Sequence, residues 1–427
     1  MHNILTEIFH KVTPVGYFVL IILSINTLNS CNHSDKTGKD LANDRGIEVI
    51  DLTSIKPTNE QILLSEIAEN IEYVPLEYNA ESMLGERGVS NVRLHDKYIF
   101  IGYIASVKQF DSTGKYIRDL YKVGRGPGET FKRDFVIDSD SSRVLVYSNY
   151  THAIQEYNFQ GDFIGKLNKS VINGSEENMF YFNRKLILNY DYWNQPQNHF
   201  IVIDLDSYEI DFVYKNYYHY IKPETKGYGV DMQIRYTSFK EFNNKFLFKE
   251  LCCDTLFQTK DFGTTEPRYI FNLGNIKVTY AEYSDWTYGI KSPEIGQVLI
   301  ADFFETNPLI VLLLGKYSNN ISNWIIASYN KSSRETVLTS NTIMRNDFDN
   351  GPDIDLKKGF NASRVLTLNN KNYLCYLIWP LDFLKLLDSG KLREKTSQYP
   401  EKTKELISLI KKLHEDDNPV LMKITLK

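Results

Sequence analysis

Hydrophobic and polar residues alternate over short stretches along most of this chain, as they do in β-strands. Ile47–Leu52 alternates apolar with polar side chains, which is typical of a strand with one buried face. A helical turn is expected at 63–67, and residues 71–76 have the pattern of a second strand. The residues after that divide into strand-rich units separated by polar turns. The pattern predicts an all-β fold.

Two of these units contain matching turns. Phe110–Ile117 and Tyr157–Ile164 each have an aromatic strand end, a turn closed by glycine, and an aromatic–Ile pair that begins the next strand. Gly161 follows Gly114 by 47 residues, and Asp204 keeps nearly the same period in a third unit. Repeats of this length are typical of stacked or radially arranged sheets, because one small sheet cannot bury its faces alone. The period alone is compatible with six to eight four-stranded units.

The pattern changes near the C-terminus. Between about 381 and 414 it predicts helix, since Leu406, Ile407, Ile410 and Leu413 have the spacing of an apolar helical stripe. Asn418–Leu426 then returns to the alternation of a strand. A last strand after a helical insertion suggests that strands from both chain ends share one sheet, which leaves no long unpaired edge.

The N-terminal residues differ in composition from the rest. The apolar run Val15–Ile25 is shorter than the about 20 residues of a membrane-spanning helix and is expected to be a signal segment. Leu28–Cys31 resembles a bacterial lipobox, which implies cleavage after Ser30 and lipidation of Cys31. The alternative is a secretory signal with an incidental cysteine. The expected organisation is a signal peptide at 1–30, a polar tether at 31–45 and one domain at 46–427.

Composition narrows the classes of partner. The net charge is -5, and no basic stripe interleaved with aromatic residues occurs, so nucleic acid is not an expected partner. Aromatic residues make up 13% of the chain, which favours β-sheet. Besides Cys31, the odd count of Cys252, Cys253 and Cys375 implies no disulfide framework, and buried thiols are the expected state.

One glycine-rich loop stands out. Val123–Glu129 holds three glycines and a proline, which indicates a sharply turning backbone. It lacks the Lys-Ser/Thr ending of a phosphate-binding loop. One interpretation is structural, with Arg125 paired to Glu129 or to another carboxylate. The other is that Arg125 and Glu129 contact a ligand, with Arg125 directed into a central channel.

Several of these features together resemble a known family, the six-bladed β-propeller lipoproteins of Bacteroidetes, which are related to NHL-type propellers. The resemblance rests on the glycine-rich loop, Phe110–Lys115, Asp254–Phe257 with Pro267–Arg268, and Asp416–Leu421. It implies an all-β, six-bladed β-propeller with four-stranded blades and a lipid anchor, and it supplies no reaction. The middle units lack the turn glycine, so their boundaries stay open.

Compact catalytic and metal-binding motifs are missing from the sequence. The histidines are scattered without ligand spacing, and no cofactor is predicted. Asp347, Asp349 and Asp353 lie in the densest acidic segment and are weak candidates for a calcium site, although they lack the ligand order of an EF-hand. A solvated acidic loop is the alternative.

Aromatic residues supply the remaining candidate contacts. Tyr192, Trp193 and Tyr218 belong to a tyrosine-rich stretch that could stack on sugar rings or anchor a protein partner. Packing between strands is the alternative for this stretch, which also contains Tyr214.

Together these features favour a non-enzymatic envelope protein, lipid-anchored at the outer membrane, that binds a glycan, a peptide or a protein. One alternative is a lyase or hydrolase with a site assembled from several blades. Another is a structural subunit of an outer-membrane uptake complex.

Overall fold

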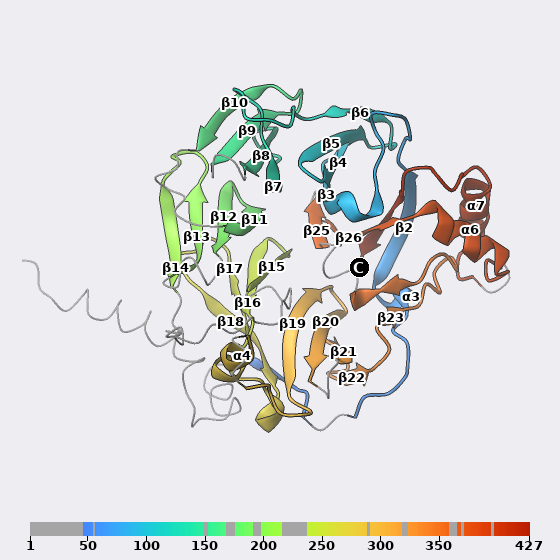
Figure 1. Cartoon of the computed structure of the whole chain (residues 1–427). Helices are drawn as coiled ribbons and strands as arrows, with labels where there is room; N and C mark the ends of the chain where they lie inside the picture. Colours follow the sequence, from blue (N-terminus) through green and yellow to red (C-terminus); the bar gives the residue numbers. More distant parts are fainter. Residues whose placement is uncertain are drawn as a thin grey trace, which may run out of the picture.

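Six β-sheets stand around a common axis in the computed structural model of the chain (Figure 1). The structure describes residues 46–53, 56–148, 153–167, 176–190, 198–215, 237–287, 291–317, 323–357, 365–368, 371–393 and 397–427. Each sheet is one blade, and its strands are antiparallel neighbours from the axis outward. The predicted six-bladed β-propeller with four-stranded blades is confirmed.

The first three blades follow one another along the chain. Blade 1 contains β3 (Val89–Leu94), β4 (Tyr98–Tyr103), β5 (Ser106–Asp111) and β6 (Tyr116–Asp119). Blade 2 contains β7 (Lys132–Asp138), β8 (Arg143–Ser148), β9 (Ile154–Asn158) and β10 (Phe163–Leu167). Blade 3 contains β11 (Glu176–Phe182), β12 (Lys185–Tyr190), β13 (Asn198–Asp204) and β14 (Ile210–Lys215).

The next two blades continue the series. Blade 4 contains β15 (Thr237–Phe242), β16 (Lys245–Glu250), β17 (Thr255–Thr259) and β18 (Glu266–Asn272). Blade 5 contains β19 (Val298–Glu305), β20 (Leu309–Lys316), β21 (Asn323–Asn330) and β22 (Thr336–Thr339). A fifth strand, β1 (Glu48–Asp51), pairs in parallel with β18 at the outer edge of blade 4.

Blade 6 joins the two ends of the chain. It contains β25 (Val365–Leu368), β26 (Lys371–Ile378), β27 (Val420–Leu426) and, outermost, β2 (Ala68–Pro75). β2 is antiparallel to β27, with Ala68 opposite Leu426 and Pro75 opposite Val420. The expected closure by strands from both chain ends is therefore confirmed.

The helices, the 3-10 turns and one short strand pair lie outside the six blades. The predicted C-terminal helical insertion forms α6 (Pro380–Asp388) and α7 (Pro400–Ile410), which lie beside blade 6 (Figure 1). The other elements are α3 (Leu64–Ile67), α4 (Tyr280–Thr287), the strand pair β23 (Ile343–Met344) and β24 (Ile354–Asp355), and the 3-10 turns η2 (Glu86–Gly88) and η3 (Gly274–Ile276). Within the described ranges, none of the helices has the length and apolarity to span a bilayer.

Hydrophobic clusters fill the spaces between neighbouring blades. Successive side chains of a second strand point to opposite faces of its blade, so both faces of that strand are buried. Phe100 of β4 packs against blade 2, whereas the next residue, Ile101, packs against blade 6. The second strand of every blade is packed in the same way between its two neighbours. This explains why the sequences of these strands are continuous apolar runs.

The repeat in the sequence corresponds to the turn between the third and fourth strands. In four blades an Asp or Asn begins this turn, and its side-chain oxygen accepts bonds of 2.8 to 3.1 Å from backbone N–H groups two to four residues ahead. Such bonds favour Asp and Asn at turns. The four residues are Asp111, Asn158, Asp204 and Asn330.

A residue in the left-handed conformation closes each of these turns. It is Gly114 in blade 1 and Gly161 in blade 2, but Tyr208 in blade 3 and Arg334 in blade 5, with φ of 60° and 59°. The latter two turns are one residue longer, since their bond returns to the fourth residue back instead of the third. This difference accounts for the missing glycines in the middle units.

Candidate binding site at the end of the central channel

A cavity of about 410 Å³ opens where the innermost strands end. Five of the six blades contribute to its wall, through the last residues of β3, β7, β11, β15 and β25 or through the turns that follow them. Its volume lies within the range of about 300–1,000 Å³ that is usual for small-ligand sites. The lining residues with polar or aromatic side chains are Arg93, Ser139, Asp140, Phe180, Tyr181, Phe182, Asn183, Glu241, Asn244 and Thr367.

Tight hairpins bring these residues to the rim. β11 and β12 are joined by Asn183–Arg184, and β15 and β16 by Asn243–Asn244. All four residues have positive φ, between 48° and 59°. Two-residue turns of this kind match the twist of the flanking strands, and asparagine is favoured in them. The inner strands therefore end abruptly, which places Asn183 and Asn244 beside the opening.

Glu241 is a carboxyl group of the wall with a strongly raised pKa. It lies on β15, and its carboxyl group shares a hydrogen bond with Thr367 of β25, two blades away. Burial raises the pKa of the Glu241 carboxyl to about 7, and the hydrogen bond only partly opposes this. No basic side chain of the described residues adds to the shift. Glu241 is thus a carboxyl group without a compensating cation.

Arg93, by contrast, has a carboxylate partner within the protein. Its guanidinium lies 3.9 Å from the carboxylate of Asp134, donates to the carbonyl of Val92 at 3.0 Å, and stacks over Phe135. Asp134 also accepts bonds from the Asn91 amide and from a backbone N–H of β11. This buried carboxylate therefore connects the inner strands of blades 1, 2 and 3.

Tyr181 and Asp140 form the third polar group of the wall. The Tyr181 hydroxyl donates to Asp140 Oδ2 at 2.6 Å. Burial, together with the carboxylates of Asp140 and Asp138, raises the pKa of Tyr181 well above its usual value. The tyrosine therefore stays neutral and presents an aromatic ring beside a carboxylate.

The glycine-rich loop lies away from this cavity. It connects β6 to the start of β7, whereas the cavity is at the other end of β7. Glu129 accepts a bond from the Gly126 N–H at 2.9 Å, and a Cβ at Gly124 would lie 2.1 Å from a Glu129 oxygen. The glycines thus let this carboxylate fold over the backbone. Arg125 is exposed and does not line this cavity.

The other predicted contacts have different locations. Cys31, Tyr192, Trp193 and Tyr218 lie outside the described residues. Tyr214 is buried, stacks on Phe200 and donates to Glu250 at 2.7 Å, so it belongs to the packing between blades. Cys252 and Cys375 are free and buried, as expected. Cys253 is also buried but takes part in a disulfide bond, so the expectation of a free thiol is wrong for this residue.

The acidic segment forms internal hydrogen bonds. Asp347 accepts bonds from Ser65, Asp349 from Tyr73, and Asp353 from the backbone N–H of Asn346. Burial raises the pKa of Asp349. The part of the chain that the structure describes holds no group of three metal-ligating side chains, and calcium binding by this segment stays a prediction.

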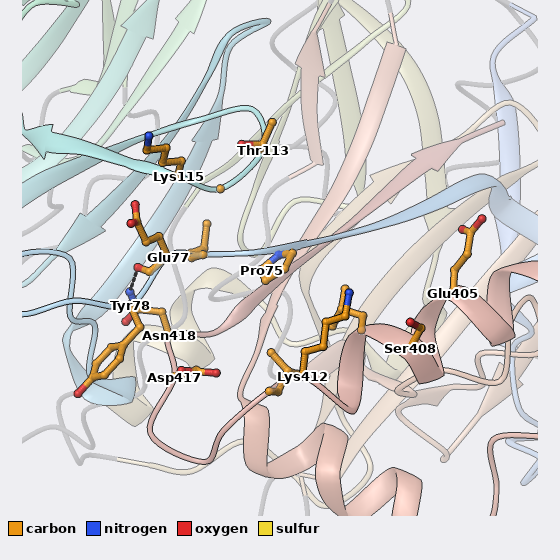
Figure 2. A pocket seen from close by; sticks show the side chains of 14 residues that line it. Pro75, Glu77, Tyr78, Thr113, Lys115, Glu405, Ser408, Lys412, Asp417 and Asn418 are labelled. Carbon is orange, nitrogen blue, oxygen red and sulfur yellow. Dashed lines mark hydrogen bonds between the residues drawn. The ribbon is translucent and has the colours of Figure 1, made fainter.

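A larger cavity of about 720 Å³ lies on the rim, where blade 6 meets blade 1 and α7 (Figure 2). Of its charged side chains, Glu77, Lys115, Glu405 and Lys412 are exposed to solvent and Asp417 is half-buried. Asn418 there donates to the Glu77 carbonyl at 2.6 Å and so holds the closure together. We therefore regard the channel cavity, which holds a half-buried carboxyl group with a raised pKa, as the better candidate site.

Glu241 was missed by sequence reasoning. The signal is visible only after the blades are aligned, because Glu241 is then the charged residue two positions before the Asn243–Asn244 turn of an inner strand. No local motif marks it.

Comparison with known proteins supports the fold. A Bacteroides fragilis protein whose name describes it as exported has a similar structure, with a TM-score of 0.60 and 14% identity over 89% of this chain and 99% of that chain. A member of the DUF4221 family from Bacteroides vulgatus has a TM-score of 0.44 and 13% identity over 84% of this chain and 97% of that one. No curated protein matches the sequence.

Family membership rests on a match over nearly the whole folded chain. Residues 47–425 match the family described as "Domain of unknown function (DUF4934)". The matched range begins at the strand β1 and ends within β27, so it includes every blade. The chain belongs to the DUF4934 family.

Proposed function

We propose that this protein is an interaction module of the bacterial envelope that takes part of its ligand into the channel cavity. The observation that carries the proposal is the convergence of polar and aromatic side chains from five blades on one cavity that contains the half-buried carboxyl group of Glu241. Concave sites with a few convergent polar groups are the usual form of binding sites. The ligand is a glycan, a peptide or a segment of a protein partner.

The envelope location has two supports. The structurally similar Bacteroides fragilis protein has a name that describes it as exported. The Leu28–Cys31 segment has the pattern of a lipobox. We propose that a lipid on Cys31 anchors the propeller to the outer membrane.

This anchoring makes a direct prediction. Cys31→Ala removes the acceptor sulfur, so the variant is expected to leave the membrane fraction and appear in the soluble fraction. Immunoblotting of fractionated cells measures this, with Cys375→Ala as a matched cysteine control that keeps Cys31. Full membrane retention of Cys31→Ala would contradict the proposed anchor.

Binding in the cavity is tested by blocking it. Ser139 is exposed at the cavity wall, so Ser139→Trp fills the opening without disturbing a buried residue. Purified protein is screened against glycan and peptide arrays. We expect a ligand that binds the wild type and is lost with Ser139→Trp. Array ligands that bind both proteins equally would place the site elsewhere.

A lyase or hydrolase is the second candidate, because Glu241 has a pKa of about 7. A carboxyl group with such a pKa can exchange protons near neutral pH as a general acid or base. Turnover of a polysaccharide or peptide pool that disappears in Glu241→Gln would favour this function over binding alone.

A further inference from the structure

We propose that the channel cavity binds a positively charged side chain, lysine or arginine, presented by an extended peptide or a protein partner. The inference rests on the proposed function and deepens it by naming the class of ligand. It depends on the charge balance, the shape and the chemistry of the cavity wall.

The charge balance leaves the cavity negative. Its titratable side chains are Arg93, Asp140, Tyr181 and Glu241. Arg93 pairs with Asp134, and Tyr181 donates a neutral hydrogen bond to Asp140. Glu241 is bonded to the Thr367 hydroxyl and faces no basic group of the described residues. Within the part of the chain that the structure describes, Asp140 and Glu241 thus line the cavity without an ion-pair partner.

Several basic residues near the ends of the inner strands pair with groups of their own blades. Arg143 pairs with Asp138 and Glu156, and Lys185 pairs with Asp204 and Asp211. Arg184 similarly pairs with Asp206, and Lys245 donates to Gln258. Lys240, next to Glu241, lies 3.3 Å from Asp302 of blade 5. Among the described residues no basic side chain pairs with Glu241, so a cation of a bound molecule would supply a partner for its ionised form.

The shape of the wall fits a long basic side chain. Lysine and arginine have an apolar stem and a charged head. Leu94, Leu366 and Leu368 offer apolar surface for the stem, and Phe180 and Tyr181 offer aromatic rings near the carboxyl groups. Cations bind favourably over aromatic faces.

The rim adds contacts for a peptide backbone. The amide side chains of Asn183 and Asn244 lie in the cavity wall at the two hairpin turns. Each can both donate to and accept from a peptide group. A neutral saccharide would also use these amides, but it would leave Glu241 without a counter-charge.

Binding of a cation predicts a specific pH dependence. The complex contains the ionised Glu241, whereas the free protein protonates this carboxyl below pH about 7. The association constant is therefore expected to fall about tenfold for each pH unit below 7 and to stay level above it.

The test compares charged and uncharged probes on the full protein. The probes are acetyl-Gly-Lys-Gly-amide and its ε-acetyl-lysine analogue, and affinities are measured by ligand-observed NMR titration at pH 8 and pH 5.5. At pH 8 we expect the lysine probe to bind at least tenfold more tightly than its ε-acetyl-lysine analogue. The Glu241→Gln variant should lose this preference. Equal affinity for both probes, or a preference that survives in Glu241→Gln, would overturn the proposal.

The outcome separates this inference from the proposed function. If the lysine probe fails while N-acetylglucosamine or a neutral peptide binds the wild type and not Ser139→Trp, the cation proposal is wrong and a binding role for the cavity stands. If no probe or array ligand is lost in Ser139→Trp, both proposals are wrong.

Discussion

Gly114 shows how one residue couples two blades. It has φ of +91°, and a Cβ there would lie 2.1 Å from the Pro75 carbonyl oxygen at the end of β2. Its own carbonyl accepts a bond from the Glu77 N–H at 2.8 Å. The turn of blade 1 can therefore reach the closing strand of blade 6 only with glycine at this position.

We predict that Gly114→Ala destabilises the fold by about 2 kcal/mol or more, from the left-handed conformation and the clash together. Gly296→Ala is the matched control, because Gly296 has φ of +97° and nothing within 4 Å of an added Cβ. That control should cost about 1 kcal/mol. Thermal denaturation measures both, and equal losses would show that the approach to Pro75 carries no strain.

Glu241 should make stability depend on pH. Its pKa is about 7 in the folded protein and 4.5 as the ordinary value, so the folded state holds the extra proton between these values. Stability therefore falls as the pH rises from 4.5 to 7, by at most about 3 kcal/mol.

Glu241→Gln removes this dependence. We predict that the variant melts at a higher temperature than the wild type at pH 8 and at the same temperature near pH 4. Glu209→Gln, at an exposed turn position, is the control and should follow the wild type at both values. A melting-temperature difference that is the same at pH 4 and pH 8 would contradict the raised pKa.

At the scale of elements, the repeat in the sequence specifies the turn between the third and fourth strands of a blade. The feature that recurs in the turns of four blades is an Asp or Asn side-chain oxygen that accepts hydrogen bonds from backbone N–H groups, as at Asp111 in blade 1 and Asn330 in blade 5. Glycine is needed only in the shorter turns. The sequence therefore predicts the first two turns readily, while the longer ones depend on strain tolerated by Tyr208 and Arg334.

Neighbouring blades are also joined by buried charge. Glu305 at the end of β19 has a fully buried side chain and accepts two bonds from Arg268 of blade 4, at 2.7 and 2.8 Å. Lys331 lies 2.6 Å from the same carboxylate. Two cations between blades 4 and 5 thus depend on one anion.

We predict that Glu305→Gln destabilises the protein by about 3 kcal/mol, because it leaves two half-buried cations, Arg268 and Lys331, without a counter-charge. Asp206→Asn is the matched control, since the Arg184–Asp206 pair is exposed and should contribute little. Chemical denaturation measures both. A loss no greater for Glu305→Gln than for Asp206→Asn would refute this role.

At the scale of the molecule, the N-terminal segment contacts three successive blades. β1 pairs with blade 4, Thr58 bridges to Thr339 at the end of β22 in blade 5, and β2 closes blade 6. Ile50 of β1 is 1% exposed and packs in the cluster between blades 4 and 5. The segment is therefore part of the core and extends the closure beyond one blade.

Ile50→Ala should thus lower the stability of the whole ring, by about 2–4 kcal/mol, in a single unfolding transition. Val49→Ala, on the other face of the same strand, is the control and should cost less because Val49 is only half-buried. Calorimetry distinguishes the outcomes. A separate early transition for Ile50→Ala would mean that β1 detaches without affecting the ring.

The sequence by itself determined the class of fold, the closing strand and the C-terminal helices. These follow from local patterns, because burial of both faces of a strand or of one face of a helix is written in neighbouring residues, as in Leu406 and Ile410. The blade count came from a family resemblance and not from the period.

Only the tertiary structure decided the position of β1 and the composition of the candidate site. Glu241, Thr367 and Arg93 come from three separate blades, and no spacing in the chain relates them. The perturbed pKa of Glu241 arises from burial at the end of the channel, which exists only when the blades assemble around a common axis.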